Sequence, residues 1–546
     1  MVARAVVGIP TVLCLWISEI IASVPGRCAV TVLELLTGTM LTGYGSISQA
    51  ILAVPCRRHW TSYYWMVRKG KFDWKVMVHA LCRIVKREFP SERCVVVGDD
   101  TLIPRVSEAA PGAAIQYDHA RKPNRPDYIL AQTVVSLSAV IGNSSGSWSV
   151  PLMSNLAVHT GNHGKLETMR AMVEEVSATL GAITLLLDAW YMKGYLISDV
   201  LTRDAIVIGQ VRRDTALYDL PPLRTGKPGR PRKYGDRITK EKLNALPQTR
   251  TELPIYGGHR TVRYRTAVCM VRFLGGRLVR VVWVSMFVDG KWKAERLLLS
   301  TDWSHTAEDV IFTYSLRWTI EPMFAALKWS EGMIDMWMQS VETFHRWLNI
   351  VQIGRALIQM LAVKADAATT ALAQVAAWRK EPYLTAGMVN RPSLLEYCAG
   401  RSVAPQRAEI RPFPMRSDED QGGSDRQCRL IQPSRHQIQL LTARPAPAEP
   451  DQYVARLECL ASQIYVYIRL LWSATGVTSS PFSKINGLAR TVASLRAPIL
   501  PIPGHHRRRE ADNPSSEPFP SRRSEGRSPP DPQRPELDRA CSGTIW

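Results

Sequence analysis

The sequence contains no Cys-x-x-Cys pair, although it has ten cysteines among 546 residues. Closely spaced cysteine pairs form zinc sites, and an even number of cysteines in a short chain forms the disulfide framework of a small secreted protein. The spacing in this chain supports neither kind of site. The cysteine usage therefore indicates a reducing, cytosolic setting.

Acidic residues are also scarce relative to basic ones. The chain has 48 Asp and Glu against 69 Lys and Arg, a formal net charge of +21, and its pI is about 9.7. The excess does not come from residues 501–546, where eight basic residues meet seven acidic ones. A basic body of this length predicts two or three domains with a polyanionic partner, of which nucleic acid is the natural candidate.

A long apolar run lies near the N-terminus, but a proline and a glutamate interrupt it. Val6–Val24 follows Arg4 and is broken by Pro10 and Glu19, with no convincing small-residue cleavage site after it. A signal peptide or a membrane span is the alternative interpretation. We favour the first helix of a helical domain over residues 1–90, without membrane association.

The most informative segment is 314–328. Its polar residues Tyr314, Arg317, Glu321 and Lys328 are separated by 3, 4 and 7 positions, which on one continuous helix places them within an arc of roughly 60°. The opposite side is apolar, comprising Phe312, Leu316, Ile320, Met323 and Leu327. A carboxylate among cations suits a place where a metal ion and phosphates meet. The alternative is a solvated helix face with ordinary i,i+4 pairs.

Two apolar, β-branched runs end in aspartate. Cys94–Thr101 contains Asp99 and Asp100, and residues 182–188 end at Asp188. Short runs of this kind predict buried strands, and acids at the carboxyl ends of central strands lie where open α/β sheets bind ligands. A turn or cap role is the alternative for each aspartate.

Further elements follow in a regular order. The patterns predict strands over 94–101, 128–141, 147–158, 182–188 and 205–211, with helices over 165–180 and 191–201. Three β-rich runs, 264–273, 278–289 and 292–300, are separated by the hairpin signals Gly275-Gly276 and Asp289-Gly290. Thr306 is a plausible N-cap, and Pro322 predicts a kink or break directly after Glu321.

The spacing Tyr314-x2-Arg317-x3-Glu321-x6-Lys328 resembles the Y-R-E-K signature of bacterial insertion-sequence DDE transposases. The order of strands and helices is similar to the ribonuclease-H-like core of that family. The resemblance implies an α/β fold with a ribonuclease-H-like mixed sheet and a β-rich insertion, preceded by an N-terminal helical domain. The expected organisation is a helical DNA-binding domain over 1–90, a catalytic core over 91–212 and 301–345, the insertion over 213–300, a helical region over 346–400, and a mostly disordered tail over 401–546.

The resemblance also implies the site. Asp99, Asp188 and Glu321 would be catalytic and would hold two Mg²⁺ ions, for which Mn²⁺ substitutes, with Asp100 as the alternative to Asp99. The family pattern Asp-x-Thr matches Asp99 and Thr101, and neighbouring side chains on a strand face opposite sides. Tyr314, Arg317 and Lys328 would contact DNA. In some members an insertion-domain tryptophan stacks on a flipped base, which makes Trp283 and Trp292 candidates beside the alternative of core packing.

Two further segments are candidates for DNA binding. Residues 57–71 interleave cations with aromatics, including Arg57, Arg58, Tyr63 and Tyr64; a helix with core aromatics and a basic face is the alternative. Gly229-Arg230-Pro231-Arg232 resembles an AT-hook, in which Arg230 and Arg232 would enter a minor groove. A flexible linker into the insertion is the alternative there.

The function implied by the resemblance is metal-dependent cleavage of transposon ends followed by strand transfer. Its partners would be terminal inverted repeats and target DNA, with a homodimer in the synaptic complex, in the bacterial cytoplasm in association with the nucleoid. Two alternatives stay open: a metal-dependent nuclease that does not join DNA, and an inactive, transposase-derived DNA-binding protein.

Overall fold

The computed structural model describes residues 2–54, 56–118, 126–157, 162–223, 231–364 and Ala386. All of the described residues belong to one compact unit of the chain. The predicted tail over 401–546, Arg230, and nearly all of the predicted helical region beyond residue 364 lie outside the described residues.

The N-terminal segment is helical in the part that the structure describes. Its helices are α1 (Val2–Ala22), α2 (Gly26–Leu41), α3 (Ile47–Leu52), α4 (Trp60–Lys69) and α5 (Lys75–Glu88). In α5 the buried residues Val78, Leu81 and Val85 recur at helical spacing and form one face. At Gly38 of α2 an added Cβ would lie 2.1 Å from the carbonyl oxygen of Ala50, so glycine is required where α2 and α3 meet. None of the described helices is long and apolar enough to cross a membrane.

A mixed sheet follows the helices. Its central strands are β1 (Cys94–Pro104), β3 (Tyr128–Asn143), β4 (Gly146–Leu156), β5 (Ile183–Leu187) and β6 (Ala205–Val211). Their spatial order is β4-β3-β1-β5-β6, antiparallel between β4, β3 and β1 and parallel between β1, β5 and β6. This mixed α/β arrangement is compatible with a ribonuclease-H-like fold. A short strand that sequence analysis missed, β2 (Ala113–Tyr117), pairs with the first residues of β3.

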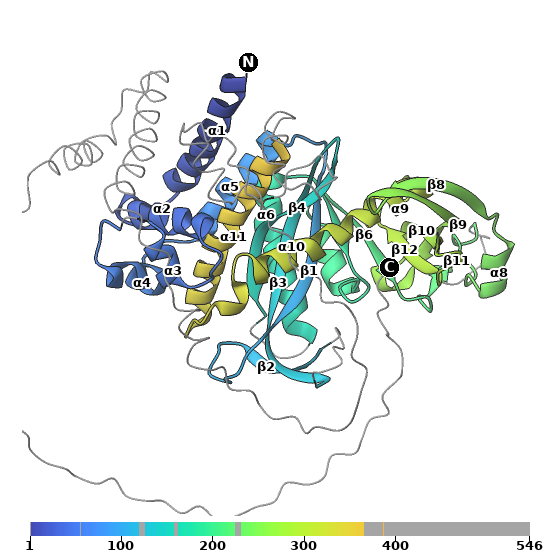
Figure 1. The fold of residues 1–546 in the computed structure, drawn as a ribbon. Coiled ribbons are helices and arrows are strands. Elements are labelled where there is room, and N and C mark those ends of the chain that lie inside the picture. Colours follow the sequence, from blue (N-terminus) through green and yellow to red (C-terminus); the bar gives the residue numbers. More distant parts are fainter. Residues whose placement is uncertain are drawn as a thin grey trace, which may run out of the picture. The chain divides into compact units, whose positions relative to one another are not determined.

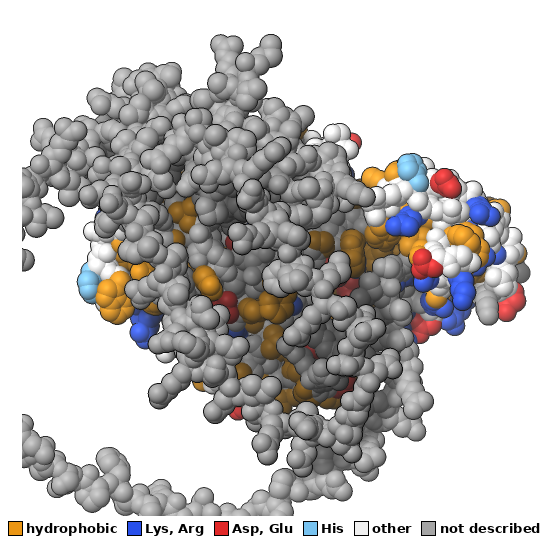
Figure 2. Space-filling model, viewed as in Figure 1, with side chains coloured by type: hydrophobic (Ala, Val, Ile, Leu, Met, Phe, Trp, Pro, Cys, Tyr) orange, Lys and Arg blue, Asp and Glu red, His pale blue; other side chains and the backbone are white. Residues whose placement is uncertain are grey.

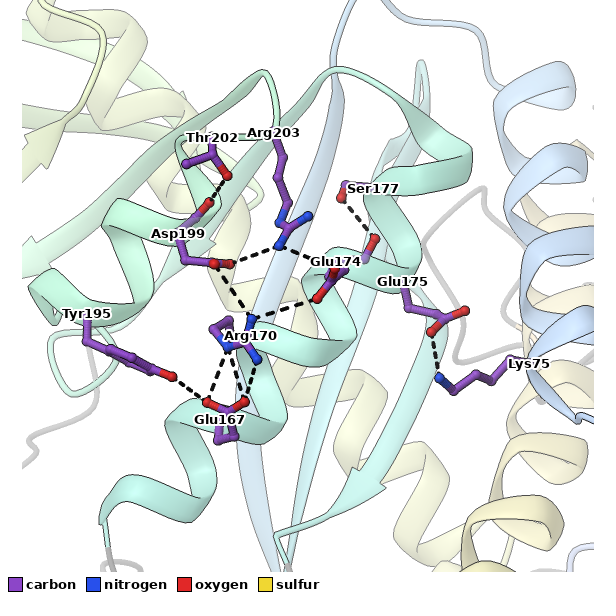
Figure 3. Close-up of polar contacts among 10 residues, drawn as sticks. All are labelled: Lys75, Glu167, Arg170, Glu174, Glu175, Ser177, Tyr195, Asp199, Thr202 and Arg203. Atoms are coloured by element: carbon purple, nitrogen blue, oxygen red, sulfur yellow. Dashed lines mark hydrogen bonds and ion pairs between the residues drawn. The ribbon is translucent and has the colours of Figure 1, made fainter.

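Helix α6 (Asn162–Leu180) packs on the sheet through Met169, Met172, Val173 and Val176, which are all buried. Its outer side carries charge, as Figure 3 shows. Arg170 forms ion pairs with Glu167, Glu174 and Asp199, the last of which lies on α7 (Gly194–Val200). The pair between Arg170 and Asp199 links α6 to α7.

The insertion continues the same sheet. It contains β7 (Leu217–Tyr218), α8 (Lys240–Ala245), β8 (Thr249–Ile255), β9 (Gly258–Val271), β10 (Arg277–Val288), β11 (Lys291–Trp292) and β12 (Arg296–Ser300). Because β12 pairs antiparallel with β6, the hydrogen-bonded order extends through β12, β10 and β9 to β7. The predicted hairpin signals form turns, with positive φ at Gly275, Gly276, Asp289 and Gly290. Sequence analysis missed β7, β8 and α8.

After the insertion the chain returns to the core as helices. Thr306 and Asp309 form a capping box at the start of α9 (Ala307–Ser315), as its N-cap pattern predicts. The short 3₁₀ segment η2 (Leu316–Thr319) then leads into α10 (Ile320–Trp329). Helix α11 (Val341–Lys364) contacts β4, β3 and the N-terminal helices α2, α4 and α5, and so lies between sheet and helices (Figure 1).

The predicted break directly after Glu321 is wrong in position. The α-helical pattern is interrupted before Glu321, at η2, and Pro322 is the third residue of α10. The N–H groups of a first turn have no intrahelical acceptor, so a proline there removes no hydrogen bond. The 3₁₀ segment has about three residues per turn, so α9 and α10 do not share one continuous helix face. Phe312, which was expected on the apolar side, is 42% exposed.

Candidate active site at the end of the parallel strands

The two predicted aspartates lie side by side, Asp99 in β1 and Asp188 directly after the neighbouring strand β5. Gly98 and Leu187 are partners in the parallel β1–β5 register, and Asp99 and Asp188 follow them directly. Pairing between β1 and β5 ends there, whereas β1 itself continues to Pro104 against β3. Asp99 is therefore inside its strand, not at its end, because the long β3 supplies hydrogen-bond partners beyond the acids.

Arg317 brings the charged helix segment to these acids. Its Nη1 donates to Asp99 Oδ2 at 2.8 Å and lies 3.8 Å from Glu321 Oε1. Burial lowers the pKa of Arg317, but Tyr314, Asp99 and Glu321 raise it by a larger amount, so the guanidinium stays charged. The structure thus gathers Asp99, Arg317 and Glu321, with Glu321 the most exposed of the three at 44% of its side chain.

The carboxylates of Asp99 and Asp188 repel each other, and a bound cation would offset this repulsion. Burial raises the pKa of Asp99 well above its usual range, and Asp188 adds to the rise while Arg317 opposes it. Burial likewise raises the pKa of Asp188, opposed by the backbone N–H of Tyr191 and by Arg317. Adjacent, partly buried carboxylates of this kind fit an oxygen-preferring divalent cation.

Glu321 does not lie close enough to Asp99 and Asp188 to form a three-carboxylate metal site with them. Among the described residues, no three His, Cys, Asp or Glu side chains are grouped closely enough to hold a metal ion. Arg317 instead lies between Asp99 and Glu321 as their counter-ion. The donor chemistry of Asp99 and Asp188 fits a metal ion, and Glu321 is the outlying member of the predicted triad.

Asp100 belongs to a different environment from Asp99. It accepts hydrogen bonds from Lys165 Nζ at 2.9 Å and from the Tyr191 hydroxyl at 2.8 Å. Lys165 is on α6, and the neighbouring Gly98 faces Met169 of the same helix. Asp99 faces Arg317, on the other side of the sheet, as strand alternation requires.

Tyr314 is buried beside the site, with 7% of its surface exposed. Burial raises its pKa to about 12, against the influence of the nearby Arg317. The covered ring has little surface for a direct DNA contact, and the contact expected of Tyr314 stays a prediction. Arg296 of β12, which sequence analysis did not single out, is a second cation close to Tyr314 and Arg317.

The helical segment 57–71 divides into buried and exposed members. Tyr63 is fully buried, and its hydroxyl donates to Glu34 Oε2, which favours the alternative of a core aromatic for this residue. The cations Arg57 and Arg58 and the ring of Tyr64 are exposed, and so are the rings of Trp60 and Trp65, at 57% and 60%. Helical periodicity within 60–69 would have separated these two sets.

Exposed members of this segment line a cavity of about 530 Å³. Its charged and aromatic lining comes from Arg27, Arg58, Lys71 and Trp65, and its hydroxyl groups come from Thr31, Thr61 and Ser62. Arg27 also donates to the carbonyl oxygen of Lys71 at 2.8 Å, so two of the lining residues are joined directly. Cations, hydroxyl donors and a flat ring are the groups that contact a nucleic-acid backbone and its bases.

The insertion carries the remaining candidates. Arg232 is exposed and lies 3.5 Å from Asp236; its predicted partner Arg230 is outside the described residues. Trp283 is buried in β10, whereas the ring of Trp292 lies under the guanidinium of Arg263 at 4.4 Å. Figure 2 shows Lys and Arg interspersed with hydrophobic side chains over this part of the surface. Lys328, in the last turn of α10, is partly buried.

Residues 28–267 match the family described as DDE superfamily endonuclease. The match covers somewhat less than half of the chain; it includes Asp99 and Asp188 and ends before Glu321. Together with the fold it supports a DDE-type transposase family, whose enzymes act on DNA and generally use divalent metal ions. None of the curated proteins compared with the chain matches it.

Proposed function

We propose that the chain is a DNA transposase of the Y-R-E-K group that cleaves transposon ends and joins them to target DNA. The observation that carries the proposal is the placement of Asp99 and Asp188 side by side at the end of the parallel strands, with Arg317 2.8 Å from Asp99 and 3.8 Å from Glu321. The family match supports a nuclease or transposase type of activity, and the Y-R-E-K spacing favours the transposase.

The metal ions expected by this proposal would be held by Asp99, Asp188 and Glu321. Divalent ions there would activate the attacking oxygen and stabilise the leaving oxygen of an in-line displacement. The chain's own contribution is to keep two carboxylates adjacent and partly buried, where they favour a cation. Arg317 supplies positive charge between the acids, and a guanidinium has five N–H donors, so one that serves Asp99 still has donors for a phosphate.

A nuclease without joining activity is the second candidate function, since the same acids and ions would cut DNA with water. The cavity lined by Arg27, Arg58 and Lys71 favours the transposase, because an enzyme that joins ends must hold them after cutting. The two functions are separated by products. A transposase yields covalent joints between end and target DNA, whereas a nuclease yields cut ends alone.

The phosphate contacts of the charged helix segment can be tested by salt dependence. Changing Arg317 or Lys328 to alanine should weaken binding to DNA of any sequence and lower the slope of log affinity against log salt by about one unit for each phosphate that the side chain neutralises. Binding is measured by fluorescence anisotropy in EDTA. Slopes that equal the parent's in both variants would show that neither side chain neutralises a phosphate.

The cavity lined by Arg58, Lys71 and Trp65 allows a separate prediction about DNA binding. Arg58→Ala and Lys71→Ala should each lower the salt slope by about one unit, because both cations line the same cavity. Trp65→Ala should weaken binding with an unchanged slope, since the ring carries no charge. The matched control is Arg83→Ala: this arginine is half-exposed in the same domain but lies 3.8 Å from Glu19 and does not line the cavity. A slope that falls equally in the control would assign the effect to overall charge.

A further inference from the structure

A buried polar network lies behind the candidate active site, on the face of the sheet opposite Arg317. It consists of Lys165, Asp100 and Tyr191, from α6, β1 and the loop after β5. Tyr191 is fully buried, and the side chains of Asp100 and Lys165 are 16% and 24% exposed. Burying an ion pair with a tyrosine hydroxyl costs free energy unless every group is satisfied. A network kept in such a place therefore invites a functional explanation.

Two members of the network contact the candidate metal ligands through the backbone. Asp100 donates its own N–H to Asp99 Oδ1 at 2.8 Å. Tyr191 donates its N–H to Asp188 Oδ1 at 3.0 Å, and its hydroxyl donates to Asp100 Oδ1 at 2.8 Å. The side-chain bond between Tyr191 and Asp100 thus links the two peptide groups that orient Asp99 and Asp188.

Lys165 and Trp190 provide the remaining contacts of the network. Lys165 Nζ donates to the second oxygen of Asp100, Oδ2, at 2.9 Å, and lies 4.9 Å from the centre of the Trp190 ring. Trp190 donates its N–H to Asp188 Oδ1 at 3.0 Å, alongside that of Tyr191. The Asp188 carboxylate therefore accepts hydrogen bonds from the N–H groups of Trp190 and Tyr191. The side chain of Trp190 contacts Lys165, and that of Tyr191 contacts Asp100.

We propose that Asp100, Tyr191 and Lys165 are positioning residues, which hold Asp99 and Asp188 at the spacing that a divalent cation requires. The inference rests on the proposed function, since it assigns the two carboxylates to metal binding. It also explains why two adjacent aspartates occur in β1: Asp99 faces the reacting side, and Asp100 anchors the loop that carries Asp188. Hydrogen-bonding groups behind metal ligands commonly tune the affinity for the metal.

The test compares two tyrosines of the same region in the full chain. Tyr191→Phe removes only the hydroxyl that reaches Asp100. Tyr195→Phe removes a hydroxyl that donates to Glu167 on the outer side of α6, and it serves as the matched control (Figure 3). Binding of Mn²⁺ alone is measured by titration calorimetry, cleavage is measured as a function of Mn²⁺ concentration, and DNA affinity is measured in EDTA.

We expect Tyr191→Phe to bind Mn²⁺ about tenfold more weakly than the parent. The Mn²⁺ concentration for half-maximal cleavage should rise by the same factor, while the rate at saturating Mn²⁺ and the DNA affinity stay near those of the parent. Tyr195→Phe should match the parent in all three measurements. A purely structural role would lower the melting temperature without moving the metal dependence.

Equal Mn²⁺ affinity in Tyr191→Phe and the parent would overturn the inference and leave the proposed function intact. Absence of Mn²⁺ binding and cleavage in the parent would overturn both. If Tyr191→Phe does not fold, Lys165→Gln decides, because it alters the partly exposed end of the network: weaker Mn²⁺ binding supports the positioning role, and unchanged binding refutes it.

Discussion

Replacing Asp188 by alanine, or Glu321 by glutamine, is expected to abolish DNA nicking and joining, with a drop of at least about a thousandfold in rate. Both changes remove a carboxylate that the proposed mechanism assigns to a metal ion. Affinity for DNA in EDTA should persist, because the binding cations, among them Arg58 and Lys71, are elsewhere. Nicking is followed on supercoiled plasmid and binding by anisotropy.

The control for this pair is Glu167→Gln. Glu167 is also a partly exposed carboxylate that pairs with an arginine, but it lies on the outer side of α6 (Figure 3). This variant should cleave like the parent. If Asp188→Ala and Glu321→Gln lose DNA affinity to the same extent as cleavage, the two carboxylates have a structural role and not a catalytic one.

Asp99→Ala should lose all Mg²⁺-dependent cleavage, whereas Asp100→Ala should keep measurable activity. The reason is the pleat of β1, which turns Asp99 towards Arg317 and Asp100 towards Lys165. Cleavage at saturating Mg²⁺ separates the two variants, and circular dichroism checks that both fold. Complete loss in Asp100→Ala together with activity in Asp99→Ala would make Asp100 the ligand and refute the facing argument.

Sequence patterns were sufficient for β5 and β6 because those strands are short, apolar and bounded. The run before Asp188 and the run over 205–211 are buried almost throughout, and such segments have few alternatives to a central strand. Strands of the insertion such as β8 were missed because their residues are mostly exposed and polar. Pairing partners, not the apolar pattern, define those strands.

The contents of the site were harder to predict than its location. An arc drawn for one continuous helix correctly grouped Arg317 with Glu321, but it took no account of the 3₁₀ segment or of the burial of Tyr314. Tyr63 and Tyr64 were grouped by composition alone, although helical periodicity places the buried Tyr63 and the exposed Tyr64 on different sides of α4. Lys165 gives no sequence signal, because its partner Asp100 is 65 positions away.

The most direct test of the account is the reaction of the purified full chain with DNA that carries both flanks of its own gene. With Mg²⁺ the account predicts strand cleavage at the element ends and covalent joining of those ends to a second plasmid. Neither product should form in EDTA or with Glu321→Gln. Cleavage that persists in EDTA, or in Glu321→Gln, would contradict the metal-dependent triad, and cleavage without any joined product would make the chain a nuclease.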